Sequence, residues 1–151
     1  MADNVTPFRP RRPTPKPTQR GGGLSSHRGK AVLVHALTLA AFGLSLLLVL
    51  PSPFNLIAIA VGIGAFLIAY TNRAEAMPWA QTHHEHALRT LMIGYAIWII
   101  ASLLLSLFGP LAVAIPFVRF GVLIWVAVRA GAGLVLAILR KPIPHPRGVL
   151  L

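Results

Sequence analysis

The sequence predicts an all-α protein, a four-span transmembrane helical bundle with a disordered basic N-terminal arm. Apolar residues make up 56% of the 151 residues and charged residues only 11%, whereas charged residues are roughly 25% of a water-soluble domain. From residue 31 onward the apolar stretches are long enough to cross a bilayer. Lysine and arginine outside these stretches recur at alternate connections, a pattern typical of a multi-pass membrane protein.

The N-terminal arm covers residues 1–30. It is rich in proline and holds seven of the 14 basic residues, so it has too little apolar content to fold and is expected to be disordered with polyproline II character. Its prolines are spaced P-x-x-P, the formal pattern of an SH3-type ligand. The stronger expectation is contact with anionic lipids of the inner leaflet, which attract basic segments, and no binding to nucleic acid.

The first two predicted spans are Ala31–Leu50 and Phe54–Tyr70. Twenty helical residues cover a hydrocarbon core of about 30 Å. The first span is longer than the apolar region of a signal peptide and no A-x-A-like site follows it, which argues against cleavage. Only Pro51–Pro53 separates the two spans, so they are expected to form a tight antiparallel hairpin. Tyr70 is expected at the level of the lipid headgroups.

The third predicted span is Thr90–Phe108, and the fourth runs from about Pro116 to Leu139. Proline is tolerated in the first turn of a helix, which favours Pro116 as the start of the fourth span. Leu111–Ile115 is short and apolar and is interpreted as a loop or a distorted extension of that helix. The segment between Arg73 and Arg89 interrupts the apolar pattern and forms the second connection.

The fourth span contains two arginines, Arg119 and Arg129. On the insertion scale its Leu, Ile, Phe and Val residues contribute roughly −6 kcal/mol, against about +2.5 to +3.5 kcal/mol for each arginine at the centre of the membrane. The arginines lie about 15 Å apart along a helix, so each can extend toward its own surface, which lowers that penalty. The segment is therefore expected to span the membrane in contact with other helices.

Lysine and arginine outside the spans number seven in the arm, none in the first connection, two in the second, none in the third and three in the tail. With four spans, every positive segment falls on one side. The positive-inside rule then predicts that both termini lie in the cytoplasm. Residues 31–141 form the predicted transmembrane domain, and residues 142–151 form a short cytoplasmic tail.

The densest group of polar side chains is His83-His84-Glu85-His86, at the cytoplasmic end of the third span. His83 and His86 share one face of a helix and, with Glu85, offer three ligands for a divalent metal ion, but neither H-x-x-x-H nor H-E-x-x-H is present. Contact with lipid headgroups or a partner protein is expected instead, and a pH-responsive role is the alternative. No cysteine, nucleophile motif or cofactor loop occurs in the chain, so the sequence predicts no enzyme activity, no metal and no cofactor.

An ionisable residue inside a span is a functional-site hypothesis by default. Trp125 lies four residues before Arg129 and Gly133 lies four after it, so an indole, a guanidinium and a gap share one stripe of the helix. A cation–π contact or a lipid phosphate would anchor Arg129 structurally. The alternative is a solute or ion path lined by Arg129 and Arg119. Glu75 and Glu85 are the acidic partners that the sequence offers near the inner surface.

From Ile68 onward, the segments IAYTNRAEAMPW, THHEHALRT, IWVAVRAGAGL and RKPIPHP resemble a family of small, uncharacterised bacterial inner-membrane proteins. The matching positions are Thr82-His83, Leu88-Arg89-Thr90, Trp125 with Arg129, and Lys141-Pro142, whereas His84 and His86 replace aromatic residues of the family pattern. That family is distantly likened to a chloroplast inner-envelope import component with four spans, so the resemblance implies a four-span fold. Likeness of fold does not by itself transfer a function.

The function expected from the sequence is a non-enzymatic role in assembly, as a scaffold or in interaction with other membrane proteins or with a second copy of the chain. The alternative is a small oligomeric channel or transporter, in which Arg129 and Arg119 would face an anion path. Four short spans rarely enclose a pore alone, so that alternative requires at least a dimer. His83, Glu85, His86, Arg89, Arg119, Trp125 and Arg129 are the candidate functional or structural polar residues.

Overall fold

The structure, a computed structural model, describes residues 23–47, 54–74, 76–108 and 113–149, and within these ranges it consists of helices without strands. The helices are α1 (His27–Leu47), α2 (Phe54–Asn72), α3 (Pro78–Leu107) and α4 (Ile115–Ile138). The predicted all-α class and the number of helices in these ranges are thus confirmed. Most of the arm for which disorder is predicted, residues 1–22, lies outside the described residues.

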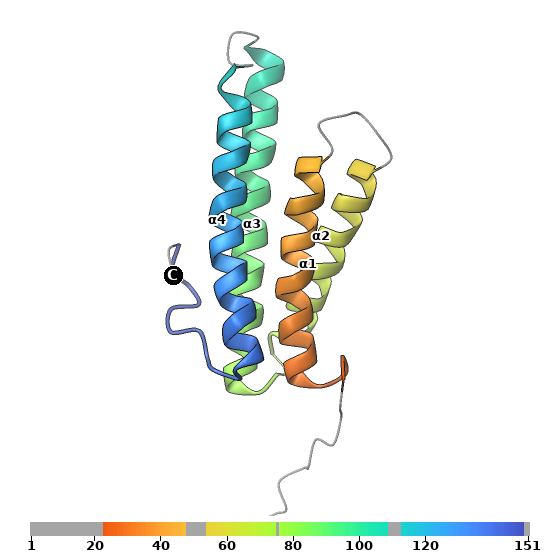
Figure 1. The fold of residues 1–151 in the computed structure, drawn as a ribbon, viewed down its shortest axis with the longest axis vertical. Helices are drawn as coiled ribbons and strands as arrows, with labels where there is room; N and C mark the ends of the chain where they lie inside the picture. Colours follow the sequence, from red (N-terminus) through yellow and green to blue (C-terminus); the bar gives the residue numbers. More distant parts are fainter. Residues whose placement is uncertain (1–22, 48–53, 75, 109–112, 150–151) are drawn as a thin grey trace, which may run out of the picture.

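The four helices run up and down as two antiparallel hairpins (Figure 1). α1 packs against α2 and α4, α3 packs against α4 and α2, and α1 also contacts α3 across the bundle. The pair α3–α4 extends past α1–α2 at the end opposite the start of α1 (Figure 1). We call the end that holds the start of α1 and the end of α4 the lower end.

Local sequence signals explain where the helices begin. The hydroxyl of Ser26 accepts a hydrogen bond from the N–H of Gly29 at 3.0 Å and caps α1, which therefore starts four residues before the predicted span. Pro116 lies in the first turn of α4, as predicted. Pro78 opens α3 twelve residues before the predicted start at Thr90, since Pro in a first turn favours a helix whether or not the next residues are apolar.

The centre of the bundle is apolar and built around Phe42 of α1. The Phe42 ring lies 4.9 Å from the ring of Tyr95 and 6.3 Å from that of Trp98, both on α3. A Cβ at Gly94 would come within 2.6 Å of the Phe42 ring, so this glycine provides the room for the aromatic contact. The buried core cluster around it comprises Phe42, Ala65, Leu91, Val122, Val126 and Ala130.

Two helices, Pro78–Leu104 and Pro116–Ile138, are long and apolar enough to cross a membrane, by length and composition. Leu56–Asn72 is a shorter apolar helix. Only 33% of each of the two longer apolar windows is buried inside the protein. The large apolar side chains left exposed on α3 and α4 include Ile99, Ile100, Leu103, Leu107, Phe117, Phe120, Ile124 and Val128.

Candidate functional site

The most densely hydrogen-bonded polar site among the described residues involves the segment that follows α4. We call residues 141–149 the C-terminal strap. Arg140 has a positive φ of 56°, which ends α4 in a left-handed turn and reverses the chain. The strap then runs back up beside α3 and α4 (Figure 1). It has no regular secondary structure, so side chains of the helices must satisfy its peptide groups wherever they are shielded from water.

The first anchor of the strap lies near the start of α3. His83 Nε2–H donates to the backbone oxygen of Lys141 at 2.8 Å, and the hydroxyl of Thr82 accepts from the N–H of Ile143 at 3.0 Å. The Ile143 side chain is only 5% exposed. Two backbone bonds and one buried apolar side chain therefore fix the beginning of the strap on α3.

The second anchor is Arg129 of α4, whose side chain is 1% exposed. Its Nη1 donates to the backbone oxygens of Gly148 at 2.8 Å and Val149 at 2.7 Å, and its Nε donates to the hydroxyl of Thr90 at 3.2 Å. The guanidinium carbon lies 5.2 Å from the centre of the Trp125 ring. Hydrogen bonds to an ionised donor are the stronger kind, so Arg129 ties the strap to both α3 and α4.

Neighbouring side chains complete this second anchor. Trp125 Nε1–H donates to the backbone oxygen of Val149 at 3.2 Å, so the indole holds the same carbonyl as Arg129. The Thr90 hydroxyl donates to the backbone oxygen of His86 at 2.8 Å, which leaves its lone pairs directed to Arg129. Of the two partners that the sequence offered for Arg129, a cation–π contact or a lipid phosphate, the structure shows the contact with Trp125.

A third set of contacts lies at the surface. Glu85 Oε1 is 3.4 Å from Arg89 Nε and 3.5 Å from Arg147 Nε, and Arg89 Nη1 donates to the backbone oxygen of Arg147 at 3.3 Å. Exposed ion pairs contribute little stability, about 0–1 kcal/mol. Glu85 thus pairs with two surface arginines, neither of which is Arg119 or Arg129, and Glu75 lies outside the described residues.

Histidines of α1 and α3 meet beneath the strap. The rings of His83 and His86 lie 5.3 Å and 5.7 Å from the ring of His35, and His35 Nε2 is 3.2 Å from His83 Nδ1. Because His83 Nε2 donates to a carbonyl, the neutral ring accepts at Nδ1 and His35 donates. The described part of the chain holds no group of three or more His, Cys, Asp or Glu side chains placed to bind a metal ion.

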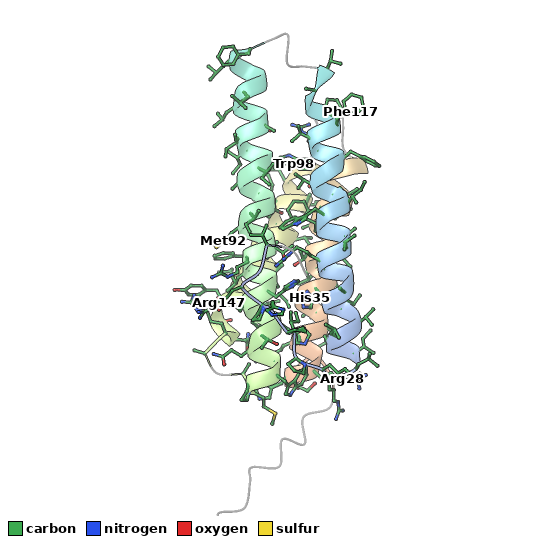
Figure 2. All side chains as sticks on the ribbon, turned by 90° about the vertical axis from the view of Figure 1, so that its left-hand side faces the viewer. Arg28, His35, Met92, Trp98, Phe117 and Arg147 are labelled. Atoms are coloured by element: carbon green, nitrogen blue, oxygen red, sulfur yellow. The ribbon has the colours of Figure 1, made fainter. Side chains whose placement is uncertain are left out.

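A glycine of α4 makes room for this histidine group. A Cβ on Gly133 would overlap the His35 ring, and the distance to His35 Nδ1 would be 2.8 Å. The sequence places Trp125, Arg129 and Gly133 on one stripe of α4. In the structure the strap contacts Trp125 and Arg129, and the His35 ring packs against Gly133. His35 lies in the lower half of the bundle, well below Trp98 (Figure 2).

Arg119 is not part of this site. Its Nη2 donates to the hydroxyl of Ser102 at 3.1 Å, and its guanidinium carbon lies 5.1 Å from the Trp98 ring. These partners belong to the upper half of α3, away from the strap (Figure 2). The structure therefore brings six of the seven candidate residues to the strap or its supporting histidines, namely His83, Glu85, His86, Arg89, Trp125 and Arg129, and leaves Arg119 apart.

Sequence reasoning missed His35, Thr82 and Thr90 as members of the site. His35 carried a signal, since it is an ionisable residue inside an apolar span. The two threonines lie in the segments of the family resemblance, and these segments hold the strap: Thr82, His83, Arg89, Thr90, Trp125 and Arg129 all bond to it or to one another. No family model, curated protein or solved structure matches the chain.

Proposed function

We propose that this chain is a four-span protein of the bacterial inner membrane with both termini in the cytoplasm and a non-enzymatic role in assembly or interaction with other membrane proteins. We also propose that the chain is a member of the small inner-membrane family that its sequence resembles. The observation that carries it is the use of Arg129, a buried charge inside an apolar helix, to hold a segment of the chain itself.

Burial and charge support the membrane location. The core helix of a water-soluble protein is mostly buried, whereas α3 and α4 bury only 33% of their apolar windows, and exposed apolar surface of this extent is typical of contact with lipid or with another membrane protein. The basic residues of the connections gather at the lower end, where the chain enters α1, passes from α2 to α3 and leaves α4 (Figure 1). This distribution is the one that the positive-inside rule requires.

The lengths of the first two helices support four spans. α1 has 21 residues and α2 has 19, so each is about 30 Å long, close to the hydrocarbon thickness of a bilayer. Lys30 at the lower end of α1 donates to the side-chain oxygen of Asn72 at the end of α2 at 2.6 Å. The ammonium group and its partner therefore lie together at one end of the hairpin, an arrangement that supports the proposal that this end lies at the inner headgroups.

The partners of the two intramembrane arginines favour assembly over transport. Arg129 contacts Thr90, Trp125 and the strap, and Arg119 contacts Ser102 and Trp98. An arginine that lines an anion path must exchange its partner with the solute, whereas these guanidinium groups are engaged with fixed protein groups. The exposed apolar faces of α3 and α4 are then the surfaces available to another membrane protein.

Crosslinking in living cells tests the proposal. A photoreactive residue is introduced at Ile100 on the exposed face of α3, and as a matched control at Leu91, which is buried in the core. The proposal expects one recurring membrane protein crosslinked through position 100 and none through position 91. Adducts with lipid alone at position 100 would contradict an interaction role.

Liposome flux separates assembly from transport. The purified protein and its Arg129→Ala and Arg119→Ala variants are reconstituted, and the leak of small anions is measured. We expect the same background leak in all three preparations. A chloride or phosphate flux in the wild-type protein that Arg129→Ala abolishes would replace the assembly role by the transport alternative.

A further inference from the structure

A cavity opens at the lower end of the bundle, beside the start of α1. Its volume is about 630 Å³, and it lies where the start of α1, the start of α3 and the end of α4 come together. The side chains that give it its character are His27, Arg28, Met77, Trp79, Ile138 and Arg140. The lining is therefore partly basic and partly apolar or aromatic.

No acidic side chain among the described residues compensates the positive charge of this cavity. None of its lining residues is acidic. Arg28 and Arg140 are both exposed, and within the described ranges no ion pair or side-chain hydrogen bond involves either guanidinium. The other arginines near the strap, Arg89, Arg129 and Arg147, all have protein partners. Two guanidinium groups line this cavity, and none of its lining residues carries a carboxylate. Such a cavity suits a ligand with negatively charged oxygens.

Arg140 occupies the left-handed turn that ends α4, and its side chain lines the cavity. Among the described non-glycine residues, Arg140 is the one with a positive φ, at 56°. This position follows the end of α4, where glycine is the usual residue because a side chain is strained there. Arg140 thus supplies one of the cavity's two guanidinium groups, neither of which has an ion pair with another described residue.

We propose that this cavity binds the phosphate group of an anionic membrane lipid. The Arg28 and Arg140 guanidinium groups hold the phosphate oxygens, and the glycerol and upper acyl chain lie against Met77, Trp79 and Ile138. Tryptophan is common at the level of lipid headgroups, which fits the place of Trp79 in the wall. The inference rests on the membrane location proposed above. Free inorganic phosphate shares the recognised chemistry, and the experiment separates the two sources.

Native mass spectrometry of the full chain in detergent tests the site. The protein is titrated with phosphatidylglycerol, with phosphatidylcholine and with inorganic phosphate, as wild type and as Arg28→Gln, Arg140→Gly and Arg73→Gln. Arg73→Gln is the matched control, since Arg73 is an exposed arginine at the same end that packs over Tyr70 and does not line the cavity. Arg140→Gly removes the guanidinium and relaxes the backbone, so its unfolding temperature should equal or exceed that of the wild type.

We expect one phosphatidylglycerol bound per chain, about tenfold weaker binding in Arg28→Gln and in Arg140→Gly, and wild-type binding in Arg73→Gln. Phosphatidylcholine should bind more weakly, because its choline cation opposes the two arginines. Bound lipid that millimolar phosphate does not displace identifies the lipid headgroup as the ligand. Phosphate that binds alone, with the same sensitivity to the two variants, identifies the free anion and still supports the site.

Two results would overturn the inference. One is phosphatidylglycerol binding that is unchanged in the Arg28→Gln, Arg140→Gly double variant, because the cavity would then have no part in it. The other is an equal loss in Arg73→Gln, because diffuse positive charge would then explain the binding. A wild-type protein that binds phosphate at the cavity but no lipid would contradict the proposed membrane location while leaving the anion site in place.

Discussion

At the scale of single residues, Arg129 determines how the polar part of the bundle is organised. A buried guanidinium is strongly unfavourable unless its charge is matched by acceptors. In this protein the acceptors are two backbone oxygens of the strap and the hydroxyl of Thr90, with the Trp125 ring against the guanidinium. Removal of Arg129 would leave the Gly148 oxygen and the Thr90 hydroxyl without this donor, whereas the Val149 oxygen would keep the N–H of Trp125.

We therefore predict that Arg129→Ala lowers the free energy of unfolding in mixed micelles by about 3 kcal/mol, since hydrogen bonds to a charged donor contribute about 1.5–3 kcal/mol each and part is recovered by relaxation. Limited proteolysis of the same variant should cut within residues 141–149 faster than in the wild type. Arg119→Ala is the control, because Arg119 contacts Ser102 and Trp98 of α3 and is not part of the strap site. Equal exposure of the strap in both variants would contradict the role given to Arg129.

Two glycines of α4 allow a matched comparison. A Cβ at Gly133 would overlap the His35 ring, whereas a Cβ at Gly131 would meet nothing within 4 Å. Gly133→Ala should destabilise the protein by about 1–3 kcal/mol through overpacking. Gly131→Ala should be neutral or stabilise it by up to about 1 kcal/mol, because alanine favours a helix.

Thermal unfolding of the two variants in detergent measures this difference. The double variant Gly133→Ala, His35→Ala should recover part of the loss, because the smaller side chain vacates the space that the new methyl group needs. Equal stability of Gly131→Ala and Gly133→Ala would mean that α1 and α4 do not approach as closely as the structure places them.

At the scale of elements, the strap depends on the helices and contributes little by itself. It has no regular secondary structure, and its backbone is held by side chains from α3 and α4. Arg129 in turn depends on the strap for two of its acceptors. The two halves of such an arrangement stabilise one another and are expected to respond as a unit.

Truncation after Ile143 tests this coupling. It removes the carbonyl groups of Gly148 and Val149 but keeps the bonds of His83 and Thr82 to the start of the strap. We predict that the truncation and Arg129→Ala are each destabilising and that the combined variant loses less than the sum by about 1–3 kcal/mol. Strictly additive losses in the free energy of unfolding would show that Arg129 and the strap contribute independently.

At the scale of the whole molecule, the two hairpins share one polar end. The entry into α1, the α2–α3 connection and the exit from α4 all lie at the lower end, and the α3–α4 pair extends beyond its neighbours at the other (Figure 1). If the bundle crosses the membrane four times, the strap and the phosphate-binding cavity both lie at the inner face. Their accessibility from each side of the membrane is therefore the decisive measurement.

The natural chain has no cysteine, so single substitutions report their own position. We predict that Ser25→Cys and His145→Cys react with a membrane-impermeant maleimide only after the inner face is opened, whereas Val113→Cys, at the upper end between α3 and α4, reacts in intact spheroplasts. All three positions are exposed. Labelling of positions 25 and 145 from opposite sides would rule out an even number of crossings.

By itself the sequence determined the helical class, the number of helices and the place of Trp125 and Arg129 on one stripe of a helix, because apolar run lengths, prolines and i,i+4 spacing are local properties of the chain. It also singled out most residues of the polar site. It did not reveal that α3 begins at Pro78, because hydropathy records which segments tolerate lipid and does not record where a helix starts.

Only the tertiary structure decided what those residues contact. His35 and His83 are 48 positions apart and Arg129 and Thr90 are 39 apart, and nothing local in the sequence specifies which helices will neighbour one another. The strap is the clearest case. Every residue carries a backbone oxygen whatever its side chain. The sequence pattern therefore could not show that the oxygens of Gly148 and Val149 are the acceptors for Arg129. Packing in three dimensions made that assignment, because a buried guanidinium requires whichever oxygens the fold brings within reach.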